Sequence, residues 1–496
     1  MWWRDTARML VIVLLCCAAA PAMAQQDELA EARRAAREGK HSQALAAIER
    51  VLERESGNIE ARMEYARVLS WAGRYDDALR AYQAVLVLDA NNEEAIVGRA
   101  RVLYWSGRLN AAAAALHGVN SPEGRLLLAE VERARGHNDR ALAVLNPLGP
   151  PGAKLRESIR QELRPVLRFG YALEDDRELP EIGAGSTVRA ARYTVAMEFN
   201  VHPDVRVKLS SVVTRGSTSS AGASLYGANA LAVATMAEVR FRPEHWLALN
   251  LGVGEGSTGA AAGGPGIERA RHEHFLYAIH PVVRWRGLRL DFAASRGLGD
   301  YTPLAIHNNV IEQRETVAAS YAWRRLKAGG EYWHAGYGLE SPDTSGPREW
   351  KTSADGGAAF VTPVLYRGER LLLEAGARYE AYGFEASAAA IPAPGFFTPR
   401  SYQRYGGTGH AWWRPHTRVE VDVSGLLGRQ RFFLFDTSGA HGFSLTGNLD
   451  AKVTLKLGRV EPFVAYGYSS AQTAAAATAP ANYWVHAVGA GISTRF

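Results

Sequence analysis

Two histidines that flank a glutamate are the first candidates for chemistry, at His272, Glu273 and His274. Alternate residues of a strand share one face, so two imidazoles at this spacing could hold a metal ion. The pair has no third ligand beside it in the sequence, and the same residues also suit an ordinary junction between a loop and a strand. The chain contains no Gly-x-Ser-x-Gly, His-Glu-x-x-His, phosphate-loop or calcium-loop motif. We therefore predict no catalytic residues, no metal site and no cofactor.

Charged side chains that alternate with aliphatic ones form a second candidate group, in segments such as 204–210, 287–292 and 418–424. This period of two predicts strands whose two faces meet different surroundings. In a barrel, the charged members would line the lumen: Arg206, Lys208, Arg289, Asp291, Arg418, Glu420 and Asp422. Their mixed signs suit a hydrated wall without a strong ion preference. The alternative is a sugar path, in which aromatic residues such as Tyr402 and Trp412 contact ring faces.

The elements that would position these side chains are about sixteen strands between residue 161 and Phe496. Their connections alternate between tight turns, such as Arg286-Gly287, and long loops, such as residues 254–271. An even number of antiparallel strands with short turns at one end and long loops at the other is typical of outer-membrane β-barrels. A secreted β-sandwich is the alternative, but it would not need this asymmetry of the loops.

The end of the chain and its tryptophans fit the same architecture. Phe496 continues the alternate face of Trp484, Val488 and Ile492, and this resembles the terminal signal by which the barrel assembly machinery recognises such proteins. Tryptophans near strand ends predict aromatic girdles at the two membrane interfaces. They are Trp246, Trp285, Trp323, Trp333, Trp350, Trp412, Trp413 and Trp484.

Residues 1–24 have the pattern of a signal peptide. Arg4 and Arg8 precede an apolar run, and the segment ends in a small-x-small site at Ala22-Met23-Ala24. Both cysteines of the chain, Cys16 and Cys17, lie inside this segment, so the mature protein would have no disulfide and would depend on a large core or a bilayer. The 57 basic and 51 acidic residues nearly cancel, which argues against a nucleic-acid partner.

Residues 25–160 contain an internal repeat. Glycines recur every 34 residues, and each is followed five residues later by an alanine: Gly39 and Ala44, Gly73 and Ala78, Gly107 and Ala112. A period of 34 with glycine at a turn and alanine at a helix contact predicts tetratricopeptide repeats, which stack as helix pairs. Trp71 and Trp105 occupy equivalent positions in successive repeats. They either pack between repeats or form an exposed pair that grips a peptide or a sugar.

A short segment before a late strand carries a family resemblance. It reads Gly395, Phe396, Phe397, Thr398, Pro399, Arg400, Ser401 and Tyr402. This segment, together with a signal peptide, repeats and a barrel, resembles the outer-membrane exporters of bacterial exopolysaccharides. The similarity is greatest to the cellulose synthase operon C protein family, and the repeats are also similar to those of YaiO-type proteins. The cellulose exporters carry a far longer repeat array than this chain.

The sequence thus predicts a multidomain α+β protein with a signal peptide (1–24), a periplasmic α-solenoid (25–160) and a transmembrane antiparallel barrel (161–496). The resemblance implies a non-enzymatic channel for a cellulose-like polymer, located in the outer membrane. Its partners would be outer-membrane lipid, the polysaccharide chain, and periplasmic or synthase proteins that dock on the repeats. The alternative is a general pore or a structural surface protein whose repeats bind other proteins.

Overall fold

The structure is a computed structural model of the chain. It describes residues 28–177, 186–220, 223–261, 271–299, 302–340, 349–391, 396–435, 441–472 and 482–496. The predicted signal peptide, residues 1–24, lies outside the described residues. The chain divides into two compact units, one ending at Gln161 and the other running from Glu162 to Phe496, and each is described by itself.

The first unit is an array of helix pairs. A helix over residues 28–37 precedes the others. The named helices are α2 (His41–Arg54), α3 (Ile59–Trp71), α4 (Tyr75–Leu88), α5 (Glu93–Trp105), α6 (Leu109–Ala115), α7 (Pro122–Arg135), α8 (Asn138–Leu145) and α9 (Ala153–Leu163), with short 3-10 turns η1 (Asn146–Leu148) and η2 (Pro150–Gly152) before α9. The predicted helical array is confirmed.

The repeated glycines and alanines have distinct roles in this array. Gly39, Gly73 and Gly107 have φ angles of 77°, 74° and 75°, in the left-handed region that favours glycine at a helix end. The alanines that follow them, Ala44, Ala78 and Ala112, are fully buried. A larger side chain at these alanines would push the paired helices apart.

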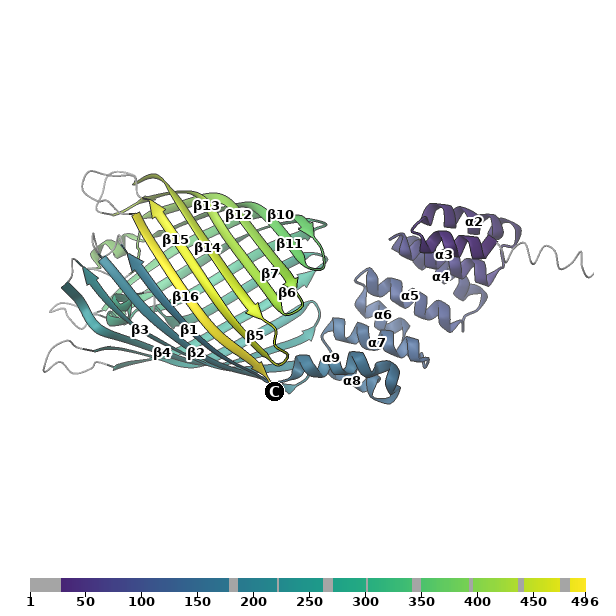
Figure 1. Cartoon of the computed structure of the whole chain (residues 1–496), viewed down its shortest axis with the longest axis horizontal. Helices are drawn as coiled ribbons and strands as arrows, with labels where there is room; N and C mark the ends of the chain where they lie inside the picture. The colour runs from purple at the N-terminus through teal and green to yellow at the C-terminus, as the bar shows by residue number, and fades with distance from the viewer. Residues whose placement is uncertain are drawn as a thin grey trace, which may run out of the picture. The chain divides into compact units, whose positions relative to one another are not determined.

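The second unit is a closed barrel of 16 antiparallel strands, which confirms the predicted fold (Figure 1). The barrel closes where β1 pairs with β16 through the register Val166 to Arg495. The strands are β1 (Val166–Arg177), β2 (Ser186–His202), β3 (Val205–Ser220), β4 (Ala223–Glu244), β5 (Leu247–Ala261), β6 (Arg271–Trp285), β7 (Leu288–Leu298), β8 (Ile311–Trp323), β9 (Leu326–Glu340), β10 (Glu349–Arg367), β11 (Leu371–Phe384), β12 (Ser401–His416), β13 (Val419–Phe433), β14 (His441–Leu455), β15 (Val460–Gln472) and β16 (Asn482–Arg495).

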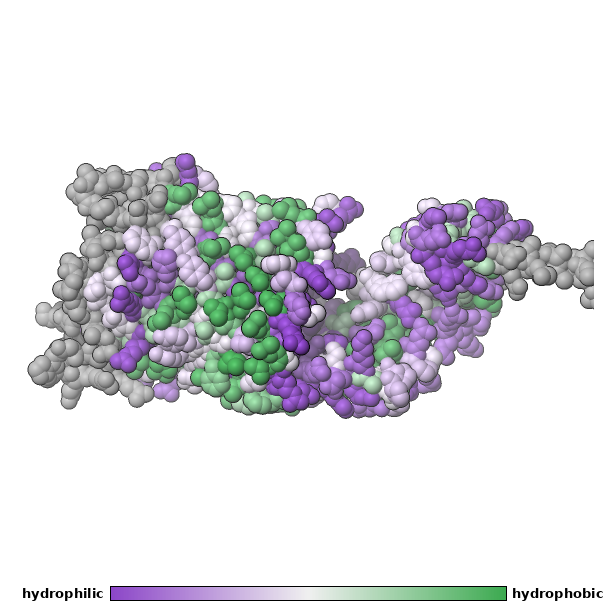
Figure 2. Space-filling model, viewed as in Figure 1, coloured by the Kyte–Doolittle hydropathy of each residue, from purple (hydrophilic) through white to green (hydrophobic). Residues whose placement is uncertain are grey.

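The outer face of the barrel is apolar. On β1, Phe169 and Leu173 are exposed, and on the neighbouring β2 the exposed residues include Val195 and Met197. Figure 2 shows hydrophobic residues gathered over the middle of the strands, with hydrophilic residues at the tight-turn rim. Such a belt is the surface that a membrane-spanning barrel presents to lipid. None of the helices in the described part of the chain has the length and apolar character needed to cross a membrane.

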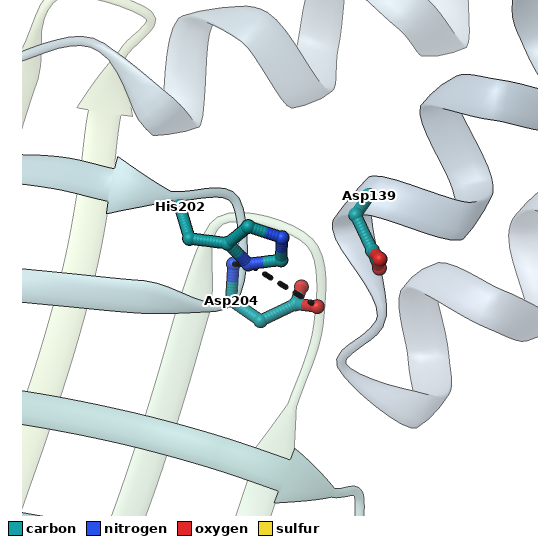
Figure 3. Close-up of side chains that lie close together, drawn as sticks. All are labelled: Asp139, His202 and Asp204. Carbon is teal, nitrogen blue, oxygen red and sulfur yellow. Dashed lines mark hydrogen bonds and ion pairs between the residues drawn. The ribbon is translucent and has the colours of Figure 1, made fainter.

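The tight turns depend on local backbone geometry. Arg286 and Gly287 both have positive φ angles, 45° and 87°, as a two-residue turn between right-twisted strands requires. Between β2 and β3, the backbone N–H of Asp204 donates to Nδ1 of His202 at 3.3 Å, and this ring nitrogen lies 3.9 Å from an oxygen of the Asp204 carboxylate (Figure 3). At the other end, β3 continues to Ser220 and β4 begins at Ala223.

Candidate functional site

The lumen wall carries ion pairs that link neighbouring strands. Arg206 on β3 lies with its Nε 2.8 Å from an oxygen of Glu198 on β2, and Lys208 pairs with Glu238 on β4. Arg289 Nη2 lies 2.6 Å from an oxygen of Asp291. His280 on β6 also contacts the Asp291 carboxylate, at 3.2 Å.

A second group of lumen ion pairs centres on a histidine. His410 on β12 lies between Glu374 on β11, 3.0 Å from its Nδ1, and Asp422 on β13, 3.3 Å from its Nε2. Glu420 lies 3.5 Å from Arg414 and 3.8 Å from Lys456. Arg418 differs from the prediction, because it is exposed in the two-residue turn before β13 and not in the strand. The alternation of β13 begins at Val419, one residue after this turn.

A third group was missed by the sequence analysis. Arg378 on β11 reaches Glu331 on β9 at 2.7 Å and lies 3.6 Å from Glu380. Glu380 in turn lies 2.8 Å from Arg404 on β12. The alternation of Arg378 and Glu380 around the exposed Tyr379 could have identified them, since it is the same pattern that singled out the other charged strands. Together, the three groups give the lumen paired charges of both signs.

The long connection between β7 and β8 folds into the barrel. It contains a short helix, α10 (Pro303–His307), in which Pro303, Leu304, Ala305 and Ile306 are buried. Ile306 packs on Ala230 and Ala232, which lie on the inner face of β4. The side-chain oxygen of Asn309 accepts hydrogen bonds from the hydroxyl of Thr258 and, at 2.9 Å, from Nε2 of His274. His274 therefore holds this infolded segment in place.

The connection between β11 and β12 also folds inward. It contains a 3-10 turn, η3 (Ala386–Ala390), and the described part of the family motif, the segment 395–402 that carries the family resemblance. Phe396 is buried and stacks on Tyr337 of β9 with ring centroids 5.0 Å apart. Ala305 and Val310, from the β7–β8 connection, belong to the same buried cluster as Ala388, Ile391 and Phe396. The two connections thus belong to one apolar cluster inside the lumen, together with residues of the strands such as Ala335 and Tyr337.

The remaining motif residues have structural positions. Phe397 packs edge-on against Phe432 at 5.2 Å, Thr398 is partly buried, and the carbonyl of the buried Pro399 accepts a hydrogen bond from the Phe384 amide. Gly395 lies outside the described residues.

The tryptophans predicted to form girdles do not all lie on the outer surface of the barrel. Trp285, Trp323 and Trp413 are exposed on the barrel. Trp333 and Trp350 instead pack against the buried lumen cluster. Tyr402, which could be a sugar contact by its sequence, is buried. Its hydroxyl donates a hydrogen bond to the side-chain oxygen of Gln430 at 3.1 Å. Trp412 lies under the guanidinium of Arg414, 4.9 Å from the ring centroid. Tyr402 is thus buried, and Trp412, which is half-buried, has one face of its ring against Arg414.

The helical array has a groove of its own. Trp71 and Trp105 are about half exposed and line a cavity of about 210 Å³ with Tyr82 of α4 and Gly98 of α5. Burial raises the pKa of Tyr82 to about 12. The tryptophans therefore face a groove and are not confined to contacts between repeats.

Arginines repeat every 34 residues beside this groove. Arg33 Nε lies 2.7 Å from Glu64, Arg67 Nη1 lies 2.7 Å from the same carboxylate, and Arg101 lies 2.7 Å from Glu123. The pairs of Arg33 with Glu64 and of Arg101 with Glu123 link one repeat to the next, whereas the pair of Arg67 with Glu64 lies within α3.

We expect Gly98→Val to destabilise the helical array. A Cβ atom at Gly98 would lie 2.5 Å from the Tyr82 ring, which is buried and has little room to move. Overpacking of this kind costs about 1–3 kcal/mol. Thermal unfolding of the full-length protein, followed by the helical signal at 222 nm, measures the effect. Gly57→Val is the control, since a Cβ atom there meets open space. Equal melting of both variants would contradict the packing described for Tyr82.

The repeat region matches a known family model. Residues 35–86 and 71–121 match a tetratricopeptide repeat model, which confirms the predicted repeats. The comparison with curated proteins found no match.

Solved structures resemble the chain in two different regions. A chain described as a bacterial polysaccharide outer membrane secretin is similar with 11% sequence identity and a TM-score of 0.48, over 67% of this chain and 99% of that chain. MamA from Desulfovibrio magneticus RS-1 is similar with 18% identity and a TM-score of 0.24, over 28% of this chain and 81% of that chain. A tetratricopeptide repeat protein from Parabacteroides merdae has 16% identity and a TM-score of 0.25, over 27% and 56% of the two chains.

Proposed function

We propose that this protein is an outer-membrane channel that exports an exopolysaccharide, with a cellulose-like polymer as its cargo. The observation that carries the proposal is the lumen of the closed barrel, where paired charges line the wall and two infolded connections meet near the long-loop end. A wall of paired charges offers hydrogen-bond donors and acceptors to sugar hydroxyls and does not favour a small ion of one sign. The barrel acts as a conduit and catalyses no reaction.

The tetratricopeptide repeats would serve as the docking unit of this channel. In the proposed arrangement they lie in the periplasm and bind a synthase, a scaffold or a modifying enzyme through the groove of Trp71 and Trp105. Synthesis of the polymer on the inner side would then supply the driving force for export. The long connections would face the cell exterior, as in other outer-membrane barrels.

Removing charges from the lumen tests the proposal. We expect the triple variant Arg289→Ala, Asp291→Ala and Asp422→Ala to lower polysaccharide release several-fold in a strain that lacks the native gene. Insertion of the barrel should be unaffected, because inward side chains contribute little to burial in lipid. Sugar analysis of the medium measures release, and heat-modifiable migration on gels measures the folded barrel.

The control variant is Arg286→Ala with Arg324→Ala, two positions with positive φ in the tight turns, outside the lumen wall. It should insert and release polymer like the native protein. Unchanged release by the triple variant would count against passage of the polymer along this wall.

A further inference from the structure

A cavity of about 660 Å³ lies in the lumen beneath the two infolded connections. Its lining comes from β9, β11 and the family motif on one side and from β1 and β2 on the other. These two groups of strands are separated by several strands in either direction around the closed sheet. The cavity therefore reaches across the lumen, and its volume is in the range of about 300–1,000 Å³ that is usual for small-molecule sites. A polymer that travels through the barrel must pass it.

One side of the cavity is aromatic. Tyr382 and Phe397 line it and are partly exposed, while Tyr337, Phe384 and Phe396 also line it but are buried. Tyr382 is supported by Tyr402, with ring centroids 4.8 Å apart. The partly exposed rings are thus held in fixed positions by packing from behind. Such a surface suits a ligand with a flat apolar face.

The rest of the lining is mostly charged, and most of its charges are paired. It contains four carboxylates and three guanidiniums. Glu174 lies 3.4 Å from Arg192, and Glu331 lies 2.7 Å from Arg378. Arg314 lies over the ring of Trp333, 4.3 Å from its centroid, which fixes its guanidinium at the cavity wall. These groups can bond to hydroxyls as donors and acceptors, whereas a charged ligand would meet groups of its own sign.

We propose that this cavity binds uncharged pyranose rings, the repeating unit of a neutral polysaccharide. A pyranose has apolar C–H faces and a rim of hydroxyl groups, which match the aromatic side and the paired charges of the cavity. Tyr382 and Phe397 contact the ring faces, and Arg192, Arg378 and their carboxylate partners bond to the hydroxyls. This inference rests on the proposed export function and specifies where, and for which chemical class, the lumen makes its contacts.

Binding of short oligosaccharides to the folded full-length protein tests the site. The probes are cellohexaose, which is neutral, an oligogalacturonate, which is anionic, and a deacetylated chito-oligosaccharide, which is cationic. Calorimetry in detergent measures the dissociation constants. We expect cellohexaose to bind and both charged probes to bind at least about tenfold more weakly, a difference of about 1.4 kcal/mol.

Substitutions test whether the ligand binds in this cavity. Phe397→Ala should weaken cellohexaose binding about tenfold, again about 1.4 kcal/mol. Phe292→Ala, which removes a phenyl ring from the exposed outer face of β7, should leave binding unchanged. Cellohexaose should also change the tryptophan fluorescence of the native protein, and this change should be lost in Trp333→Phe. Heat-modifiable migration confirms that each variant is folded.

The site is overturned if cellohexaose fails to bind the folded protein, if Phe397→Ala binds it as tightly as Phe292→Ala, or if a charged probe binds more tightly. These results are separable from a failure of the proposed function. If deletion of the gene stops polysaccharide secretion while cellohexaose does not bind, only the site is wrong. If the deletion leaves secretion unchanged, the export function is wrong whatever the binding result.

Discussion

Replacing residues 385–399 with a short glycine-serine linker should increase the single-channel conductance of the barrel several-fold. This segment brings Ala388, Ile391 and Phe396 into the lumen, where they join Ala305 and Val310 from the β7–β8 connection in one buried cluster. Without the segment, the lumen near its long-loop end keeps the infolded β7–β8 connection but loses the infolded β11–β12 connection. Recordings in planar lipid bilayers measure the change.

A single substitution gives a milder form of the same test. Phe396→Ala removes the ring that stacks on Tyr337, so it should raise conductance or cause more frequent openings. Phe292→Ala is the control, because its side chain lies on the exposed outer face. Conductance of the shortened protein equal to that of the native protein would show that the β11–β12 connection does not obstruct the passage.

Deletion of Phe496 should strongly reduce the amount of folded barrel in the outer membrane. Phe496 is exposed, and its backbone N–H donates to the Pro165 carbonyl at 3.1 Å, beside the seam where β16 meets β1. Loss of this residue removes both a seam contact and the aromatic residue predicted as an insertion signal. Heat-modifiable migration of membrane fractions and detection of periplasmic degradation products measure the outcome.

The conservative variant Phe496→Tyr separates the effect of the aromatic ring on insertion from the effect of the chain length. It should insert almost as well as the native protein, because it keeps an aromatic residue at the same position. If the deletion variant reaches native levels in the outer membrane, Phe496 is not an assembly signal.

The fold was largely predictable because its signals are periodic. A repeat of 34 residues placed Gly39, Gly73 and Gly107 at equivalent turns, and period-two alternation identified the strands. Tight turns such as Arg286-Gly287 separate the strands cleanly, since their backbone geometry requires residues that accept positive φ. Local pattern and overall architecture agree in these regions.

The contents of the lumen were not predictable in the same way. Trp333 and Trp413 both lie in strands and look alike in the sequence, yet Trp333 lines the lumen and Trp413 is exposed outside. The difference depends on which alternate face each occupies and on contacts with distant connections. One signal was available for α10: four consecutive apolar residues from Pro303 to Ile306 are unfavourable in a loop exposed to water.

The charged residues of the candidate site were predictable only in part. Alternation identified Arg206, Arg289 and Asp422 as residues of the lumen wall. It could not show how the charges of the lumen pair, because some ion pairs, such as Arg378 with Glu331, join strands that are not adjacent. β10 pairs with both β9 and β11, and this sheet order brings the two strands within reach of each other.

The most direct test of the account is the amount of polysaccharide that cells release after deletion of the gene. We predict that extracellular polymer falls sharply, that polymer accumulates in the periplasm, and that the native gene restores release. Uptake of small sugars by liposomes that contain the purified protein is measured in parallel. If extracellular polysaccharide is unaltered while the liposomes take up sugars freely, the protein is a general pore and the export function is contradicted.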